Sequence, residues 1–338
     1  MRQVVITKAG DVDVLKVQER PALPVRHGEV RVSVKAAGIN FADIMARQGL
    51  YPDAPPIPCV VGYEVSGVIS EIGPGVDKSW QGKSVLGLTR FNGYSDEVVL
   101  PVHQLFEKPE SLSYEEAASI PVTYLTAWQL IVGMGALKSY ESILVHNAGG
   151  GVGLAAIDLA KNIGATIYGT ASSKKHEFLK ERGVHHVMDY RTGDWEKELA
   201  ARTNGRGVDL IIDPLGGGHW RKSFRALGAT GRLGMFGIST SADDGKRSKL
   251  SLLKTAIKMP FFHPVPMMNN NKGAFGVNMG HMWEEHERLA VWMQEILEGY
   301  KAGWVRPYVD SVFSFEQAGD AHKYMEERRN IGKVILVP

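Results

Sequence analysis

The fold is decided by residues 142–153, which read SILVHNAGGGVG. Residues 142–146 are an apolar run that predicts a strand, and residues 153–163 predict a helix. The turn between them fits the dinucleotide-binding fingerprint, in which glycines allow a tight turn, close approach to a pyrophosphate and close packing of helix on strand. The free N–H groups at the helix N-terminus suit phosphates. The turn therefore predicts a dinucleotide site, formed by Ala148, Gly149, Gly150, Gly151, Val152 and Gly153, with Ala148, Gly150 and Gly153 in the three glycine places.

Strands and helices alternate after this turn. Strands are predicted over residues 166–170, 208–213 and 232–237, and a helix over residues 175–182. Such alternation is typical of parallel strands with crossover helices. We therefore expect an α/β fold with a doubly wound parallel sheet, the Rossmann arrangement. Residues 239–272 are expected to be irregular, followed by a helix at 284–299 and a last strand at 333–337.

The first third of the chain has a different pattern of apolar and polar residues. Short runs with period-two alternation predict strands at residues 29–35, 65–72, 85–88 and 94–99, with glycine, proline and asparagine between them. This pattern indicates a compact barrel-like or sandwich domain. A capping box at residues 113–116 then predicts the start of a helix.

Composition excludes several classes of protein. The chain has 338 residues, a net charge of +2 and a single cysteine, Cys59. The charge gives no basic field for nucleic acid, and no apolar run reaches the length of a membrane span. One cysteine forms no intramolecular disulfide and no cysteine-rich zinc site, so a reducing cytoplasm is the simplest compartment. Residues 1–6 predict a first strand and not a signal peptide.

The end of the second strand distinguishes two cofactors. NADH-binding chains place an acidic residue there, which holds the ribose 2′-hydroxyl. Here the strand is followed by Ala171, Ser172, Ser173, Lys174 and Lys175, without a carboxylate. Hydroxyl and ammonium groups suit a 2′-phosphate. The sequence therefore predicts NADPH.

These motifs resemble the medium-chain dehydrogenase/reductase superfamily, in its quinone oxidoreductase branch, over essentially the whole chain. The resemblance rests on the segments 36–40 (AAGIN), 62–67 (GYEVSG), 72–76 (IGPGV) and 146–153. Within that branch the chain resembles the vesicle amine transport protein homologues. That likeness rests on segments 169–172, 175–177, 213–217 and 307–312 and on the ending from residue 330 to 338.

The resemblance implies a discontinuous architecture. Residues 1–122 and 280–338 would form a barrel-like, β-rich catalytic domain of the GroES-like type, and residues 123–279 an inserted Rossmann domain that binds NADPH. Homodimers are common in the family. At the places where zinc dehydrogenases carry catalytic ligands, this chain has Asn40, Tyr63 and Val122, none of them a good zinc ligand. The resemblance therefore implies an enzyme with no metal site.

The resemblance also assigns roles to single residues. Tyr51 matches a proton-donating tyrosine of enoyl-thioester reductases; the alternative is that it only lines the cleft or packs on the proline-rich turn. Asn40 is expected to hydrogen-bond the ribose or a substrate oxygen. The other expected cofactor contacts are Thr126 near the nicotinamide, Ser172, Lys175 and Tyr190 at the adenosine phosphate, Phe236, Ile238, Phe275 and Val277 at the carboxamide, and Asn330, which would close over the cofactor.

Together these features predict an NADPH-dependent oxidoreductase that transfers hydride to a quinone or an α,β-unsaturated carbonyl. One alternative is an enoyl-thioester reductase. The other is a weakly catalytic NADPH-binding protein with a lipid or membrane-contact role. That last hypothesis rests on residues 246–262, where basic and apolar side chains interleave as they do in segments that lie on an anionic membrane surface. A pocket wall or a dimer contact would explain the same pattern.

Overall fold

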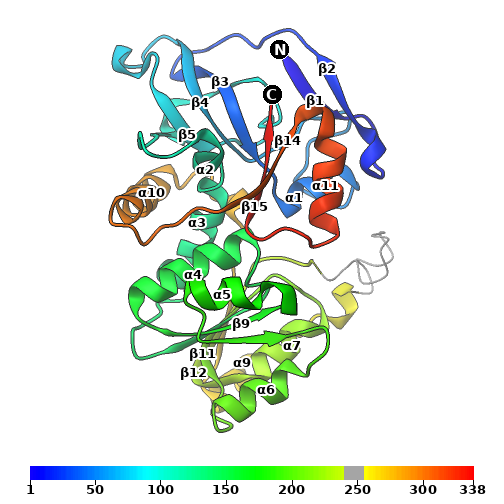
Figure 1. Ribbon diagram of the computed structural model, residues 1–338, viewed down its shortest axis with the longest axis vertical. Coiled ribbons are helices and arrows are strands. Elements are labelled where there is room, and N and C mark those ends of the chain that lie inside the picture. Colours follow the sequence, from blue (N-terminus) through cyan, green and yellow to red (C-terminus); the bar gives the residue numbers. More distant parts are fainter. Residues whose placement is uncertain (240–254) are drawn as a thin grey trace. The chain divides into compact units, whose positions relative to one another are not determined.

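The computed structural model describes residues 1–239 and 255–338 (Figure 1). Its contacts divide the chain into two compact units, and the chain passes from the first to the second within one helix, α3 (Pro121–Trp128). Unit 1 comprises Met1–Leu125, Met279–Lys301 and Pro307–Pro338. Unit 2 comprises Thr126–Asn278 and Ala302–Arg306. The domain boundaries at 122/123 and 279/280 stay predictions.

Unit 2 is built on a six-stranded sheet in which every pairing is parallel. The strand order is β10-β9-β8-β11-β12-β13. This order reverses direction next to β8, which is the switch point where doubly wound sheets bind their ligands. The strands are β8 (Ser142–Val145), β9 (Thr166–Ala171), β10 (His186–Asp189), β11 (Val208–Asp213), β12 (Leu227–Met235) and β13 (Gly273–Gly276).

Helices cover both faces of this sheet. The crossovers place α4 (Gly151–Ile163) and α5 (His176–Arg182) on one face, and α6 (Trp195–Arg202) and α7 (Gly218–Arg225) on the other (Figure 1). Burial supports this layering, because one core cluster gathers Trp195 and Leu199 of α6 against strand residues such as Ile211. The parallel sheet predicted from the sequence is therefore confirmed.

The segment Ala302–Arg306 belongs to unit 2, where it bonds to one buried carboxylate. Asp158, in the middle of α4, has a fully buried side chain. It accepts hydrogen bonds from the Arg182 guanidinium at 2.7 Å, and from the backbone N–H and guanidinium of Arg306 at 3.0 and 3.1 Å. A buried charge needs such partners to be tolerated, so α4 is tied both to α5 and to a distant piece of the chain.

Unit 1 contains a seven-stranded sheet with β3 (Glu29–Gly38) at its centre. β3 pairs antiparallel with three strands, because its first half also pairs with β6 (Glu97–Pro101). The other strands are β4 (Glu64–Ile72), β5 (Ser84–Leu88), β7 (Leu105–Glu107), β14 (Val309–Ser314) and β15 (Lys333–Val337), and a separate two-stranded sheet joins β1 (Arg2–Ile6) to β2 (Leu15–Glu19). The helices are α1 (Phe41–Arg47), α2 (Tyr114–Ala118), α10 (His286–Lys301) and α11 (Ala318–Glu326).

Several local predictions need correction. β6 begins at Glu97 and not at residue 94, because Tyr94 exchanges its backbone hydrogen bonds with Val4 and Val61. β12 starts and ends earlier than predicted. Residues 239–272 are not wholly irregular, because α9 (Pro264–Asn270) forms behind the N-cap His263. A proline in the first turn is compatible with a helix.

Among the described residues, no helix has both the length and the apolar character needed to cross a membrane. Residues 246–254 of the predicted basic and apolar segment lie outside the described residues, and residues 255–262 lie within them.

Candidate functional site

The glycine-rich turn of unit 2 is shaped for a phosphate. Helix α4 begins at Gly151, two residues earlier than predicted, with Gly150 as its N-cap. A Cβ at Gly153 would lie 2.5 Å from the backbone oxygen of Asn147 and 2.6 Å from that of Ala148. Neither oxygen can move far, because each belongs to the turn itself. Only glycine fits there, so the N-terminal N–H groups of α4 stay open to an anion.

Lys175 lies against this turn. A Cβ built on Gly149 would come within 2.7 Å of the Lys175 side-chain Cδ and 3.7 Å of its ammonium nitrogen. The aliphatic stem of the lysine therefore crosses the glycine-rich turn, and its charge lies beside the free N–H groups. Ser172, which directly follows β9 and lies three positions before Lys175, is buried. This arrangement adds a positive charge to the anion-binding end of α4.

The end of β10 adds groups to the same edge of the sheet. The guanidinium of Arg191 lies over the ring of Tyr190, 5.9 Å from its centre. Asp189 accepts hydrogen bonds from the backbone N–H groups of Ser173 and Arg191. These hydrogen bonds lower the pKa of its carboxyl, that from Arg191 most strongly. Sequence reasoning missed this carboxylate, because it lies one strand beyond the place where NADH-binding chains carry theirs.

The remaining predicted contacts of unit 2 lie at or beyond the carboxyl ends of β12 and β13. The backbone N–H of Phe236 donates to the Asp213 carbonyl, and that of Val277 to the Met235 carbonyl. Ile238 packs against Gly216, and the ring of Phe275 packs against Gly234. Thr126 is buried in α3. Carboxyl ends of parallel strands are where such sheets bind ligands.

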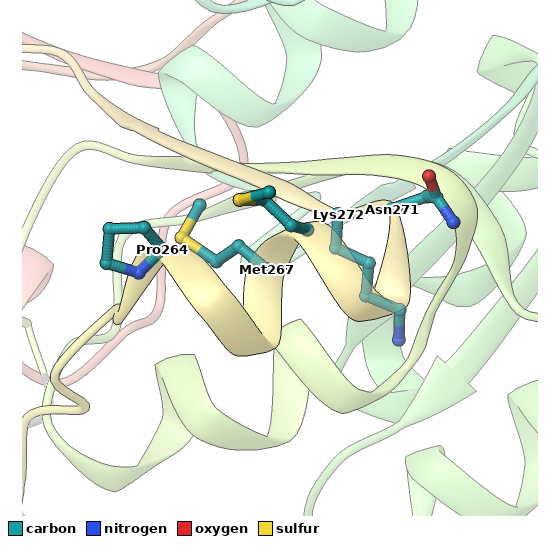
Figure 2. A pocket seen from close by; sticks show the side chains of 5 residues that line it. Pro264, Met267, Asn271 and Lys272 are labelled. Carbon is teal, nitrogen blue, oxygen red and sulfur yellow. The ribbon is translucent and has the colours of Figure 1, made fainter.

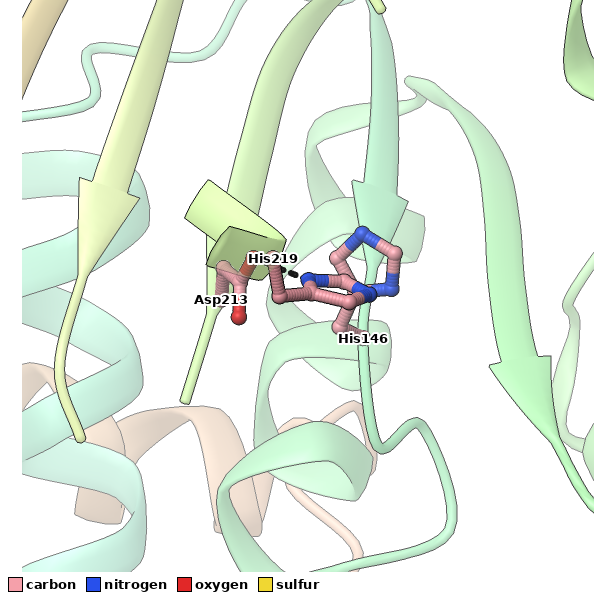
Figure 3. Close-up of side chains that lie close together, drawn as sticks. All are labelled: His146, Asp213 and His219. Atoms are coloured by element: carbon pink, nitrogen blue, oxygen red, sulfur yellow. Dashed lines mark hydrogen bonds and ion pairs between the residues drawn. The ribbon is translucent and has the colours of Figure 1, made fainter. Parts of the chain in front are cut away.

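A buried polar cluster lies at the carboxyl ends of β8 and β11 (Figure 3). Asp213 accepts hydrogen bonds of 2.7 Å from both His219 and Ser223. His146 contacts the Ser223 hydroxyl at 3.2 Å and the Thr170 hydroxyl at 2.9 Å. The ligand atoms of His146, Asp213 and His219 lie within 4.8 Å of one another, a spacing that could hold a metal ion.

The charges of this cluster suit a hydrogen-bond network. Burial, together with the nearby His219, lowers the pKa of His146 to about 3 although Asp213 opposes the shift, so His146 is neutral. The pKa of Asp213 is lowered despite burial, because His219, His146 and Ser223 stabilise its carboxylate. Both ring nitrogens of His146 have partners, and so do both oxygens of Asp213, because the backbone N–H of Leu215 donates to the second one at 2.7 Å. The cluster thus joins β8, β9, β11 and α7 beneath the dinucleotide turn.

In unit 1, Asn40 is held by a buried ion pair. Its amide nitrogen donates to Glu64 Oε1 at 3.0 Å, and its amide oxygen accepts from the Lys333 ammonium at 2.6 Å. Lys333 and Glu64 also contact each other directly, and both are almost fully buried. The other oxygen of Glu64 accepts the backbone N–H of Val122 at 2.8 Å. Glu64 therefore joins Asn40, Val122 and Lys333.

A second buried carboxyl lies behind Asn40. Asp43 accepts the backbone N–H of Asn40 at 2.8 Å, that of Gly62 at 3.0 Å and the hydroxyl of Tyr94 at 3.0 Å. Burial raises the pKa of Asp43 to about 6, although these hydrogen bonds oppose the shift. Tyr94 in turn contacts His322, whose pKa burial lowers to about 3.

Tyr51 stands in an aromatic group with Tyr63 and Phe91. The rings of Tyr51 and Tyr63 meet edge to face with centres 6.3 Å apart, and Tyr63 lies 5.3 Å from Phe91. Burial raises the pKa of the Tyr51 phenol above its usual value, and the hydroxyl of Tyr63 opposes this shift. The pKa of Tyr63 is raised for the same main reason. Both phenols therefore keep their protons at neutral pH.

Only some of the predicted site residues lie in contact with one another. In unit 2, Lys175 lies against Gly149 of the glycine-rich turn. In unit 1, Asn40 and Tyr51 belong to neighbouring groups and are not hydrogen-bonded to each other, while the Asn330 amide donates to the Gly332 carbonyl within its own turn. Sequence reasoning missed Glu64 and Lys333. Each is a charged residue at the start of a strand, a position that the sequence alone does not distinguish from a solvated strand end.

Two family models match the chain. The alcohol dehydrogenase GroES-like domain matches residues 26–110, and the zinc-binding dehydrogenase family matches residues 182–336. Together with the fold, these matches and the similarities below show that the chain belongs to the medium-chain dehydrogenase/reductase superfamily, in its quinone oxidoreductase branch. The superfamily and fold make it an oxidoreductase with a nicotinamide-dinucleotide type of cofactor site.

Among its relatives is the human synaptic vesicle membrane protein VAT-1 homolog, 38% identical over 341 residues, covering 100% of this chain and 86% of the relative. The structure of an Escherichia coli quinone oxidoreductase complexed with NADPH superposes with a TM-score of 0.88 at 26% identity, covering 100% of both chains. The CurK enoyl reductase superposes with a TM-score of 0.86 at 27% identity, covering 99% of this chain and 98% of the other.

The zinc in the family name does not fit the residues present. Where zinc dehydrogenases place catalytic ligands, Asn40 offers an amide, Tyr63 a buried phenol and Val122 only a backbone N–H that is already bonded to Glu64. Zinc prefers thiolate, imidazole and carboxylate ligands. The ammonium of Lys333 lies against both Asn40 and Glu64, so a cation already occupies this carboxylate.

Proposed function

We propose that the chain is a zinc-independent, NADPH-dependent reductase that transfers hydride to a quinone or an α,β-unsaturated carbonyl. The observation that carries the proposal is the position of Lys175 across Gly149, which puts an ammonium beside the phosphate-binding turn where the sequence has no carboxylate after β9. An ammonium favours the extra phosphate of NADPH. The likeness to an NADPH-bound quinone oxidoreductase supports the same cofactor.

The residues that would hold the cofactor in unit 2 fit its chemistry. The N–H groups of the turn from Ala148 to Gly153 would bind the pyrophosphate, and Ser172, Lys175 and Tyr190 would surround the 2′-phosphate and adenosine. Asn40, Thr126, Phe236, Ile238, Phe275, Val277 and Asn330 remain the proposed contacts to the nicotinamide half. When bound, the reduced nicotinamide supplies the hydride, and the protein supplies position and electrostatics.

Tyr51 is the proposed proton donor. Hydride addition to the β-carbon of an enone leaves an enolate, which needs a proton at carbon or oxygen. A phenol held protonated at neutral pH is a suitable general acid, and burial keeps the proton on Tyr51. Without a metal, hydrogen bonds alone would polarise the acceptor. This restricts the site to soft acceptors such as quinones and activated alkenes.

The test is a panel assay with a binding titration beside it. Oxidation of NADPH would be followed with quinones, enones, enals and enoyl thioesters, and binding of NADPH and NADH by fluorescence. We expect turnover with quinones or enones and tighter binding of NADPH than of NADH. Turnover restricted to enoyl thioesters would favour the alternative enoyl-thioester reductase, which the likeness to CurK enoyl reductase supports. Equal dissociation constants for the two cofactors would refute the cofactor assignment.

A second candidate function is contact with an anionic lipid surface. Around α9, four apolar side chains are exposed, with Phe261 at 88% and Met268 at 73%, together with Ile257 and Val265. Beside them Pro264, Met267, Met268, Asn271 and Lys272 line a shallow pocket of about 460 Å³ (Figure 2). Contiguous exposed apolar surface marks interaction sites in many proteins, and an exposed lysine, Lys258, follows Ile257.

Flotation with phosphatidylserine-containing vesicles tests this candidate. The double variant Phe261→Ser, Met268→Gln should lose the fraction that floats with the vesicles. Tyr140→Ser, which removes an exposed aromatic ring elsewhere in unit 2, should not. Absence of the wild-type chain from the vesicle fraction would exclude the candidate. Homodimer assembly and residence in the cytoplasm stay predictions.

A further inference from the structure

The orientation of the Asn40 amide is fixed by its neighbours. An ammonium can only donate hydrogen bonds and a carboxylate can only accept them. Lys333 therefore must face the amide oxygen, at 2.6 Å, and Glu64 must face the amide nitrogen, at 3.0 Å. A flipped amide would put its N–H groups against the ammonium and its oxygen against the carboxylate. Both contacts would then be repulsive.

This orientation determines which hydrogen bonds Asn40 can still make. One amide N–H is directed at Glu64, and the nitrogen also lies 3.4 Å from the Gly38 carbonyl. The donors of the side chain thus point to acceptors inside unit 1. The oxygen accepts from Lys333 and, in the capping box that starts α1, also faces the backbone N–H of Asp43. Asn40 is half-exposed, and the side-chain atom that it can offer to a ligand is this oxygen and not a donor.

The pair that holds the amide is itself rigid. Lys333 opens β15, and Glu64 opens β4, so both emerge from strands of the same sheet. The second oxygen of Glu64 is fixed by the Val122 backbone. A Cβ at Gly38 would lie 2.6 Å from Glu64 Oε1, so the carboxylate fits at this place only because residue 38 is glycine.

We propose that Glu64 and Lys333 are positioning residues, whose ion pair locks Asn40 as a hydrogen-bond acceptor for a hydroxyl of the bound ligand. The inference rests on the proposed function. Asn40 then does not polarise a carbonyl, because that would require a donor. The hydroxyl has two sources of the same chemistry: the nicotinamide ribose of the cofactor, or a hydroxyl-bearing product such as a hydroquinone.

The experiment compares ligands that differ by that hydroxyl. In one arm, dissociation constants are measured for NADPH and for its analogue lacking the 2′-hydroxyl of the nicotinamide ribose. In the other arm, inhibition constants are measured for a hydroquinone and its monomethyl ether. In wild type, loss of the hydroxyl should weaken binding about five-fold in one arm, which is the size of one net hydrogen bond. The arm that responds identifies the source.

Three variants separate positioning from folding. Glu64→Gln combined with Lys333→Met removes the ion pair without leaving a lone buried charge, and it lets the amide adopt either orientation. Lys333→Arg keeps the donor and is the conservative control, and Asn40→Ala removes the acceptor. All are first compared with wild type by circular dichroism and thermal unfolding. A role in stability alone would weaken both ligands of a pair equally, whereas a positioning role changes their ratio.

We expect the wild-type ratio in Lys333→Arg and a ratio below two-fold in both Asn40→Ala and the double variant. A folded double variant that keeps the full wild-type ratio would overturn the inference, as would a wild type that is indifferent to the hydroxyl in both arms. Either result leaves NADPH binding intact and is thereby distinct from failure of the proposed function. A wild-type chain that binds no NADPH in the titration would overturn both.

Discussion

The side chain of Lys175 lies across Gly149, so that a methyl group on that glycine would come within 2.7 Å of the lysine stem. The contact joins the start of α5 to the turn that begins α4. It couples a charge to an anion-binding turn across two consecutive βα units. From this relationship follows the first prediction.

Replacement of Lys175 by methionine should weaken NADPH binding about ten-fold or more, because a hydrogen bond to a charged group contributes roughly 1.5–3 kcal/mol. Binding of NADH, which has no 2′-phosphate, should stay the same. The readout is a fluorescence titration with both cofactors. Lys174→Met, at the exposed neighbouring position, is the matched control and should change neither constant strongly. Equal weakening of both cofactors would instead mean that Lys175 only supports the turn.

Replacement of Tyr51 by phenylalanine should separate the two substrate classes. Enone turnover should fall about 100-fold, the scale of a lost general acid, because the enolate loses its proton donor. Quinone turnover should change little, since a hydroquinone anion can take its proton from water. The dissociation constant of NADPH should not move. Tyr140→Phe, on an exposed tyrosine, is the control. Full enone activity in Tyr51→Phe would mean that Tyr51 lines the site without donating a proton.

Replacement of Asp158 by asparagine should lower the free energy of unfolding by about 3 kcal/mol, the scale for breaking a buried charge pair. The variant leaves Arg182 and the Arg306 guanidinium without their carboxylate. Urea unfolding measures the change. Glu177→Gln, on the exposed face of α5, should cost little. A loss as small as that of the control would mean that water or another group replaces the carboxylate.

Stability should fall on acidification below pH 6.5. Burial lowers the pKa of His146 and His322 to about 3, so the unfolded chain binds protons between pH 6.5 and 3 that the folded chain does not. The free energy of unfolding therefore decreases as the pH is lowered through this range. Asp43 acts in the opposite sense. Its pKa is raised to about 6, so below that pH the folded chain takes up a proton first and is stabilised. The two histidines outweigh the one carboxyl.

The urea midpoint of wild type at a series of pH values between 7 and 4 checks this expectation. His322→Gln should give a shallower dependence, because one of the two proton-binding differences is removed. His27→Gln, at an exposed position, should keep the wild-type slope. A slope in His322→Gln as steep as in wild type would show that His322 is protonated in the folded chain as readily as in the unfolded one.

The parts that could be predicted from the sequence are those whose causes are local. The turn at residues 148–153 needs glycine for steric reasons that involve only its own backbone, so pattern and structure agree there. Strands β11 and β15 match the predicted limits because their apolar runs are continuous. Helix α9 was missed because two prolines, Pro264 and Pro266, indicate a break, yet both lie in its first turn where no N–H partner is lost.

The site in unit 1 could be predicted only in part, because it is assembled from distant segments. Asn40 was predicted through resemblance, but its partner Lys333 lies 293 positions away. A lysine beside an apolar strand normally indicates a solvated end, since a buried ammonium is costly without a partner. The partner Glu64 comes from another strand, and strand order is what brings the two together. Position in the sequence alone carries no record of that order.

The hydrogen bonds between Asp158 and Arg306 have a consequence for protein engineering. Because the chain returns to unit 2 for only five residues, a fragment that ends at Asn278 would keep the glycine-rich turn but lose Arg306, one of the two arginines that bond to Asp158 of α4. Excision at a single pair of junctions would therefore yield a weakened cofactor-binding fragment. Grafting residues 302–306 back through a short linker, or opening the chain elsewhere as a circular permutant, would restore the hydrogen bonds between Arg306 and Asp158.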